Sequence, residues 1–223
     1  AVVQGEAEVG AAFAALPLDH LFFTGSTAVG RQVMAAAAAN LTPVTLELGG
    51  KSPALIAPDY PLAHAAARIV AGKYFNAGQT CIAPDYVLLP RAQRDAFADA
   101  VLAELAQRYP NLSDSPDYAG IVNARQAARL RGLIADARER GVAVREYAGA
   151  SAVPGIELVA PTLLLDPPAD SLAMQQEIFG PVLPLIGYDR LEDALAFIRS
   201  RELPLAFYPF DRDQARLSRT LDA

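Results

Sequence analysis

VTLELGGKSPALIA, residues 44–57, is the stretch of sequence that decides the fold. Its first five residues predict a short β-strand, and its last four predict another. The pair between them, Gly49 and Gly50, allows backbone angles that other residues resist. The pattern therefore predicts a domain boundary at this pair, with one domain over residues 1–49 and a second over residues 50–223.

Strand-like runs and Ala-rich helical patterns alternate on both sides of this boundary, without an internal repeat. Such alternation is typical of an α/β protein with a largely parallel sheet, and this is the predicted fold class. The expected strands are residues 20–23, 44–48, 54–57, 85–89, 142–144, 158–165, 181–188 and 205–210, and the expected helices are residues 29–39, 62–75, 91–108, 123–140 and 191–199. In the helix over residues 91–108, Phe97, Val101 and Leu105 share one face.

The composition excludes several classes of protein. Of the 223 residues, 52% are apolar, which is enough for a real core and excludes disorder as the main state. The 25 acidic and 19 basic residues give a net charge of −6 with no Lys/Arg-rich stretch, so we expect no nucleic acid partner. One cysteine and two histidines, His20 and His64, argue against a disulfide and against a metal site.

The apolar runs and the two ends of the chain bear on its location and completeness. No apolar run reaches the ~20 residues that cross a membrane, and no signal segment opens the chain. We therefore expect a soluble, cytoplasmic protein without a membrane span. The first residue is not methionine, and the chain ends in a helical pattern with no capping signal, so we expect it to be a piece of a longer protein.

Cys81, the only cysteine, lies in FNAGQTCIAP at residues 75–84. A lone cysteine is ordinarily a buried, inert small side chain. Here Gly78 permits a tight bend just before the thiol, Pro84 stops the chain just after it, and the polar residues nearby are unusual in a sealed core. A turn with oriented N–H groups favours a thiolate and binds the oxyanion formed when the thiolate attacks a carbonyl. Cys81 is therefore the candidate nucleophile.

Glu47 is the candidate general base. It lies between Leu46 and Leu48 at the end of a predicted strand, where we expect its carboxylate to be partly desolvated and so suited to accept a proton. The glycine pair that follows lets a ligand or another backbone come close. The alternative is a structural carboxylate that pairs with Lys51 or is solvated at the strand terminus.

FTGSTAVG, residues 23–30, combines the end of a strand, a glycine turn and a hydroxyl-bearing helix start. Such a turn offers free N–H groups and the positive end of a helix to an anion such as a pyrophosphate. The pattern is not G-x-G-x-x-G, and the alternative is an ordinary helix that begins at an N-cap Ser or Thr.

EIFGP, residues 177–181, places an acid and an aromatic residue two positions apart ahead of Gly-Pro. Glu177 can present a carboxylate to a ribose diol, and Phe179 can present a ring to a flat heterocycle. The alternative is the end of a helix with a packed phenylalanine.

In this order, the four segments resemble the NAD(P)-dependent aldehyde dehydrogenases. The resemblance rests on LELGGK at residues 46–51 and GQTC at residues 78–81, with base and nucleophile 81 − 47 = 34 residues apart, and on FTGS before them and EIFGP after them. It extends over essentially the whole chain. The longer form GQTCIAPDY is most similar to the class 3 and fatty-aldehyde branch and, within it, to bacterial coniferyl aldehyde dehydrogenases.

The resemblance implies a reaction. Cys81 would attack the carbonyl of a small-molecule aldehyde to give a thiohemiacetal, and its backbone N–H would form half of the oxyanion hole. Collapse of the thiohemiacetal would send a hydride to NAD or NADP and leave a thioester. Glu47 would activate the water that hydrolyses this thioester, so that the product is a carboxylic acid.

The resemblance also implies cofactor contacts. Gly25 and Ser26 would contact the pyrophosphate, and the backbone of Leu48 would lie near the carboxamide end of the cofactor. Glu177 would hold the nicotinamide-side ribose, and Phe179 would pack beside the nicotinamide. The first domain would be the C-terminal part of a Rossmann-type NAD(P)-binding domain, and the second would be a catalytic domain truncated at its C-terminus.

Members of the resembled family carry further segments at both ends, including the asparagine that completes the oxyanion hole and an oligomerisation strand. We therefore expect the isolated chain to be inactive and the intact enzyme to be a homodimer or a higher oligomer. Two alternatives remain open. One is a relative that passes the thioester to coenzyme A, against which the presence of Glu47 counts. The other is a non-catalytic structural or association module, which an inert Cys81 would indicate.

Overall fold

The computed structural model describes residues 1–148 and 155–222. Contacts divide the chain into two compact units, Ala1–Gly49 and Gly50–Ala223, which we call the small unit and the large unit. No helix within the described residues is long and apolar enough to cross a membrane.

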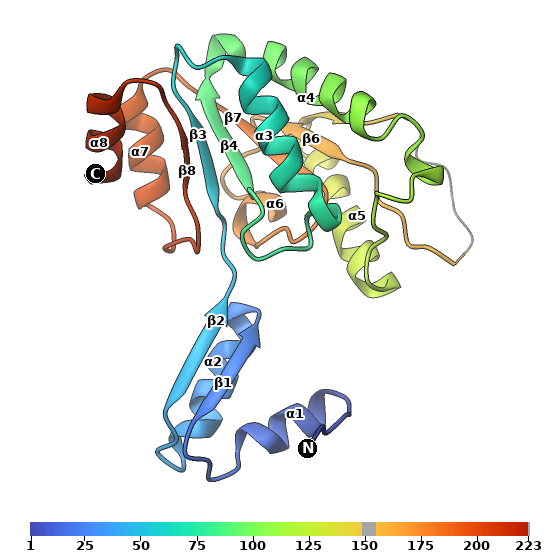
Figure 1. The fold of residues 1–223 in the computed structure, drawn as a ribbon, viewed down its shortest axis with the longest axis vertical. Helices are drawn as coiled ribbons and strands as arrows, with labels where there is room; N and C mark the ends of the chain where they lie inside the picture. The colour runs from blue at the N-terminus through green and yellow to red at the C-terminus, as the bar shows by residue number, and fades with distance from the viewer. Residues whose placement is uncertain (149–154, 223) are drawn as a thin grey trace. The chain divides into compact units, whose positions relative to one another are not determined.

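The small unit is a single β-α-β motif preceded by a helix (Figure 1). Its elements are α1 (Ala7–Ala14), β1 (Leu21–Gly25), α2 (Thr27–Ala38) and β2 (Val44–Leu48). Strands β1 and β2 pair in parallel, with Gly25 opposite Leu48. The sequence analysis predicted no helix over residues 7–14, because this segment has no capping signal: the N-cap residue Glu6 makes no side-chain hydrogen bond to the helix.

We expect the small unit to open more readily than the large one. Its described core consists of three buried residues, Ala14, Leu21 and Ala37, and larger apolar side chains such as Phe22 remain exposed. A two-stranded ladder with so little burial is marginally stable in water. Hydrogen exchange of a polypeptide of residues 1–223 should therefore show the amides of β1 and β2 exchanging much faster than those of the central strands of the large unit. Equal protection would contradict this expectation.

The large unit contains the main sheet. Within the described residues its strands are β3 (Pro53–Ile56), β4 (Tyr86–Pro90), β5 (Ala143–Glu146), β6 (Thr162–Leu165), β7 (Val182–Tyr188) and β8 (Tyr208–Phe210), in the order β5-β6-β7-β4-β3-β8. Among the strands of the described residues, β5 alone is antiparallel to its neighbour, and the other pairings are parallel. The predicted α/β class with a largely parallel sheet is confirmed.

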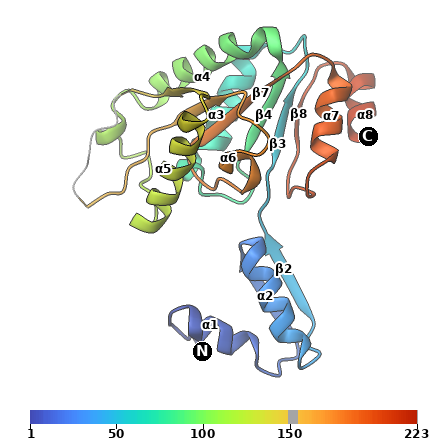
Figure 2. The same cartoon turned by 180° about the vertical axis from the view of Figure 1, so that it is seen from behind.

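Helices cover both faces of this sheet (Figures 1 and 2). They are α3 (Leu62–Tyr74), α4 (Arg94–Arg108), α5 (Ala124–Glu139), α6 (Leu172–Gln175), α7 (Leu191–Arg199) and α8 (Gln214–Asp222), with 3-10 turns η1 (Phe75–Gly78), η2 (Arg91–Gln93) and η3 (Leu112–Asp114). Helices α3 and α4 pack on one face, and α5, α6 and α7 pack on the other. Because both faces are covered, the residues of β3, β4 and β6 are almost all buried.

Most predicted elements form, with shifted ends. Phe97, Val101 and Leu105 are fully buried as expected from their shared helix face, although the first turn of that predicted helix is the 3-10 turn η2. The strand predicted over residues 158–165 begins only at Thr162, because the preceding Pro161 has no N–H to donate to a ladder. The strand predicted over residues 205–210 is reduced to β8, since its partner β3 is itself short.

Candidate active site

Cys81 and Glu177 lie in loops that lead into neighbouring strands of the main sheet. Cys81 precedes β4 and Glu177 precedes β7, and β4 and β7 pair in parallel. Both loops therefore lie at the edge of the sheet where these strands begin. Open α/β sheets more often bind ligands at the carboxyl ends of their strands, so this location is not predictable from fold class alone.

The loop before Cys81 has an unusual backbone. Helix α3 ends at Tyr74, and Asn76, Ala77 and Gly78 follow with φ values of 53°, 51° and 76°. Three consecutive residues in the left-handed region are costly for side chains other than glycine. Such strain persists only where the surroundings hold it in place.

Gln79 supplies much of that support. Its side-chain amide donates to the carbonyl oxygens of Asn76 and Gly120, each at 3.1 Å, and its side-chain oxygen accepts from the amide of Val122 at 2.9 Å. The sequence analysis noted that polar residues are unusual here, and the structure shows what Gln79 does: it ties the loop to a distant segment.

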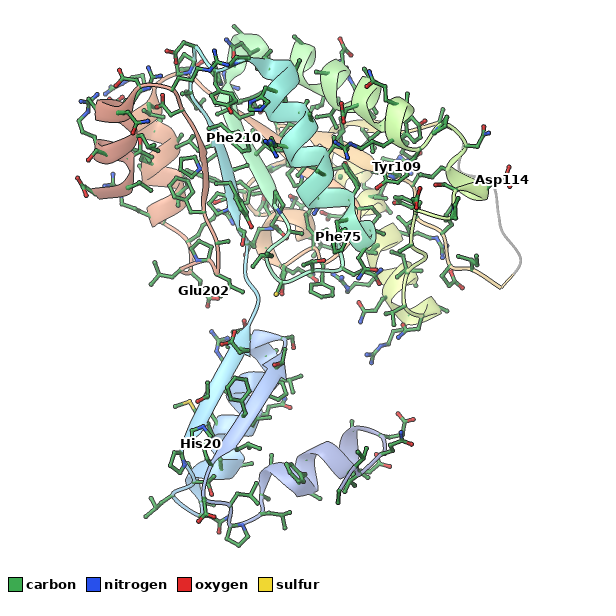
Figure 3. The ribbon with its side chains drawn as sticks, in the orientation of Figure 1. His20, Phe75, Tyr109, Asp114, Glu202 and Phe210 are labelled. Atoms are coloured by element: carbon green, nitrogen blue, oxygen red, sulfur yellow. The ribbon has the colours of Figure 1, made fainter. Side chains whose placement is uncertain are left out.

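Cys81 itself is exposed, unlike an inert core cysteine. The amide of Ala83 donates to the carbonyl of Thr80 at 3.0 Å and closes a turn around the thiol. The Tyr208 hydroxyl donates to the carbonyl oxygen of Ile82 at 2.5 Å and fixes the residue that follows the thiol. Phe75, labelled at the end of α3 in Figure 3, is 70% exposed, so the loop presents apolar as well as polar side chains to solvent.

The segment of Glu177 and Phe179 packs against the Cys81 loop. A Cβ atom on Gly78 would overlap the carbonyl oxygen of Gly180, which shows that the two backbones touch. Phe179 has a φ of 45° and is 43% exposed. The alternative was a helix end with a packed phenylalanine. The helix end is present, since α6 ends at Gln175, but the phenylalanine is not packed, because Phe179 is exposed.

We expect Gly78→Ala to lower the free energy of unfolding by more than about 2 kcal/mol, because it adds left-handed strain to an overlap with Gly180. Urea denaturation of the full-length protein measures the effect. Gly132→Ala is the matched control: it lies within α5, a Cβ there meets nothing within 4 Å, and we expect a gain of about 1 kcal/mol. A Gly78→Ala variant as stable as the parent would show that the two backbones do not touch.

The Glu177 carboxylate is half-buried. Its Oε1 accepts from the amide of Gly50 at 3.1 Å. Burial raises the pKa of Glu177 above its usual range, and the hydrogen bond from Gly50 opposes this rise. Its carboxylate is therefore held at one oxygen by the backbone, which fixes its direction.

Three charged residues surround this segment. Sequence reasoning missed the roles of Asp85 and Arg129, and it considered only Glu47 as a partner for Lys51. Asp85 Oδ1 accepts from the Ile178 amide at 2.8 Å, and Asp85 Oδ2 pairs with Lys51. Arg129, on α5, donates to the carbonyl oxygens of Glu177 at 3.3 Å and of Ile178 at 2.6 Å. The sequence analysis left open a pairing of Lys51 with Glu47, and the structure pairs Lys51 with Asp85. The one sequence feature that could have pointed to Asp85 is its position within the motif GQTCIAPDY, four residues after Cys81.

Lys73 is a further missed residue, buried to 1% exposure near the end of α3. Burial lowers the pKa of Lys73 to about 8, and the negative charge of Asp85 opposes this fall. A lysine in a helical pattern normally indicates a solvated face, so no sequence signal marked it.

The other predicted site residues lie in the small unit. Gly25 ends β1 opposite Leu48, and Ser26 is the N-cap of α2, where its Oγ accepts from the Val29 amide at 3.4 Å. The N-cap alternative for Ser26 is thus correct as a description of the local structure, and it leaves the remaining amides of the helix start available to an anion. Leu48 packs against α2, since a Cβ on Gly30 would lie 2.8 Å from Leu48 Cδ2.

Glu47 lies on β2, and its side chain is on the face of the strand opposite to Leu46 and Leu48. Its side chain is exposed, so the expected desolvation by Leu46 and Leu48 is wrong for this chain. The physical reason is the strand itself: successive side chains point to opposite faces, and both leucines therefore point away from the carboxylate.

The structure thus collects Cys81, Glu177 and Phe179 in the large unit, and Gly25, Ser26, Glu47 and Leu48 in the small unit. Within residues 1–148 and 155–222, no cluster of three or more His, Cys, Asp or Glu side chains could hold a metal ion.

Residues 1–223 match the family described as "Aldehyde dehydrogenase family". The chain therefore belongs to the aldehyde dehydrogenase family.

Within this family, the chain is similar to coniferyl aldehyde dehydrogenases. It is 53% identical over 226 residues to a probable coniferyl aldehyde dehydrogenase of Pseudomonas aeruginosa, covering 99% of this chain and 46% of that protein. It is 45% identical over 222 residues to the coniferyl aldehyde dehydrogenase of a Pseudomonas species, covering 98% of this chain and 46% of that protein. It is also 43% identical over 205 residues to aldehyde dehydrogenase family 3 member A2 of the rat, covering 92% and 41%.

Solved structures show the same fold. Substrate-bound AldH of Staphylococcus aureus superposes with a TM-score of 0.90 at 39% identity, over 99% of this chain and 47% of that one. An aldehyde dehydrogenase of Mycobacterium tuberculosis in complex with NAD+ gives a TM-score of 0.86 at 34% identity, over 98% and 46%. The chain therefore spans slightly less than half the length of the relatives it matches.

Proposed function

We propose that the protein carrying this chain oxidises an aldehyde to a carboxylic acid with NAD or NADP, through a covalent intermediate on Cys81. Membership of the aldehyde dehydrogenase family supports the reaction class. The observation that carries the role of Cys81 is its exposed thiol after three left-handed residues, in a loop packed against the segment of Glu177 and Phe179. Stored backbone strain of this kind gathers at functional sites.

Two groups of residues fit a dinucleotide. In the small unit, the amides at the start of α2 beyond Gly25 and Ser26 suit a pyrophosphate, and the backbone of Leu48 lies beside Gly25 on the paired strand. In the large unit, the half-buried carboxylate of Glu177 suits the two hydroxyls of a ribose, and the exposed ring of Phe179 suits a flat nicotinamide. When bound, the cofactor supplies a hydride acceptor.

The residues of this chain then perform the covalent steps. The Cys81 thiolate forms a bond to the carbonyl carbon of the aldehyde, and the carbonyl oxygen becomes an oxyanion that the Cys81 amide stabilises. After the hydride has left that carbon, a thioester remains on Cys81. Glu47 accepts a proton from a water molecule, the water oxygen bonds to the thioester carbon, and the thiolate leaves with the carboxylic acid as product.

We propose coniferyl aldehyde as the first substrate to test, because two of the similar relatives carry that name. Full-length enzyme is incubated with coniferyl aldehyde or with an aliphatic aldehyde, each with NAD and with NADP, and the absorbance of the reduced cofactor is followed. Formation of ferulic acid, the carboxylic acid of coniferyl aldehyde, together with one equivalent of reduced cofactor supports the proposal. Product that appears only when coenzyme A is present, as an acyl-CoA, indicates the acylating alternative, and no reduction with any aldehyde contradicts the proposal.

A further inference from the structure

We propose that Asp85 is a positioning residue that fixes the Glu177–Phe179 segment relative to the Cys81 loop, with Lys51 as its counter-charge. The inference rests on the proposed function in one respect: it takes Glu177 and Phe179 to be the residues that contact the cofactor.

Asp85 is placed to connect the two segments. It follows Cys81 by four residues in the sequence, and its amide donates to the carbonyl of Ser52 at 2.8 Å, which anchors it beside β3. Its side chain is 3% exposed, and Oδ1 accepts from the amide of Ile178 at 2.8 Å. Ile178 lies between Glu177 and Phe179, so this hydrogen bond holds the backbone between them, together with the Arg129 bonds to the carbonyl oxygens of Glu177 and Ile178.

Lys51 completes the connection from the other carboxylate oxygen. Its ammonium pairs with Asp85 Oδ2 and donates to the carbonyl oxygens of Ala173 at 2.8 Å and Gln176 at 3.0 Å. These three acceptors match the three hydrogens of the ammonium group. Lys51 therefore holds the end of α6 and the residue immediately before Glu177.

Burial of this pair is not explained by stability. Two charges withdrawn from water recover little net stabilisation, and well-packed uncharged residues commonly serve as well. The pair instead fixes the orientation of the Asp85 carboxylate, because one oxygen accepts from the Lys51 ammonium and the other accepts from a backbone amide. The segment it holds needs such support, since Phe179 adopts a left-handed backbone and Gly180 touches the Cys81 loop.

The Cys81 loop has separate supports. Gln79 ties it to Gly120 and Val122, and Tyr208 holds Ile82. Removal of the Asp85 carboxylate should therefore loosen the Glu177–Phe179 segment, while Gln79 and Tyr208 still hold the Cys81 loop. This difference separates a positioning role from general structural support.

The test compares cofactor binding with thiol reactivity in the full-length protein. Binding of NADH and of NADPH is measured by the fluorescence of the reduced nicotinamide, and acylation of Cys81 by p-nitrophenyl acetate is measured without cofactor. We expect Asp85→Ala to weaken binding of the preferred cofactor by about tenfold or more, as for a lost hydrogen bond to a charged group, with the acylation rate unchanged. Asp85→Asn, which keeps an oxygen for the Ile178 amide, should show a smaller loss.

Asp166→Asn is the matched control. Asp166 Oδ1 accepts from the amide of Gly187 at 2.7 Å and its Oδ2 pairs with Arg94, so it makes the same kinds of contact at the opposite edge of the sheet. We expect Asp166→Asn to change the melting temperature without changing cofactor affinity or acylation.

The double variant Lys51→Met/Asp85→Asn covers the case in which Asp85→Ala does not fold, because it removes both charges of the pair and leaves neither partner without the other. It lacks the Lys51 bonds to Ala173 and Gln176, and we expect it to fold yet bind the cofactor more weakly than the parent. Parent-like cofactor affinity in Asp85→Ala or in the double variant would overturn the positioning role. A parent protein that binds neither NADH nor NADPH would instead overturn the proposed function, and this inference with it.

Discussion

Cys81→Ala should abolish aldehyde oxidation in the full-length enzyme while leaving the binding of NADH measurable. The change removes the sulfur that forms the bond to the carbonyl carbon, so neither the thiohemiacetal nor the thioester can form. Loss of the nucleophile in a covalent mechanism costs about 10⁴-fold or more in kcat. The backbone of the loop should survive, because its supports come from Gln79 and Tyr208 and not from the thiol.

Two measurements make this result specific. Steady-state reduction of NAD or NADP is compared between the parent, Cys81→Ala and Cys81→Ser, and the serine variant should also be inactive because a hydroxyl is a far weaker nucleophile at neutral pH. NADH fluorescence is titrated in parallel to show that the cofactor site is intact. Retained turnover in either variant would remove Cys81 from the mechanism and favour the non-catalytic alternative.

Local patterns in the sequence were sufficient for most of the fold. β2 and α7 occupy the predicted residues 44–48 and 191–199, because each has a clear periodicity and flanking residues that end it. Asn123 and Gly141 likewise begin and end α5, where the Asn123 side chain accepts from the Gln126 amide and Gly141 has a φ of 73°. Such signals act within a few residues, which is why sequence alone carries them.

The charged groups around Glu177 could not be predicted from local sequence signals, because they come from segments that are distant in the sequence. Lys51 and Asp85 are 34 residues apart, and they meet because β3 and β4 pair in parallel with Pro53 opposite Tyr86. From the sequence, the nearby Glu47 is an equally reasonable partner for Lys51. Only the strand register distinguishes the two carboxylates, and register depends on the assembled sheet.

The location of the candidate site depends on the sheet in the same way. Cys81 of GQTC and Glu177 of EIFGP are 96 residues apart in the sequence, and Gly78 meets Gly180 only because β4 and β7 are neighbours. The types and the order of these residues were sufficient to predict them as site residues. Their contact with one another could not be predicted from the sequence. Lys73 shows the converse case, a charged residue whose burial has no local signal.

Glu47, the proposed general base, lies on β2 with an exposed side chain. Glu47→Gln keeps the size of the side chain and removes its ability to accept a proton from water. We expect the first turnover in the full-length enzyme to be impaired less than hydrolysis of the thioester, since attack by the Cys81 thiolate does not require a base to activate water. Mixing enzyme, cofactor and aldehyde rapidly should therefore produce a burst of reduced cofactor, followed by a steady rate lower by ~10²–10⁴-fold.

Glu8→Gln provides the matched control for this prediction, because Glu8 is another exposed carboxylate of the small unit and lies on α1, outside the proposed machinery. It should show the parent steady rate and no added burst. Hydroxylamine, a stronger nucleophile than water, should restore turnover in Glu47→Gln by attacking the accumulated thioester without a general base, and it identifies hydrolysis as the blocked step. If Glu47→Gln turns over as fast as Glu8→Gln, Glu47 is a solvated carboxylate at the end of a strand, and the water must be activated by another group.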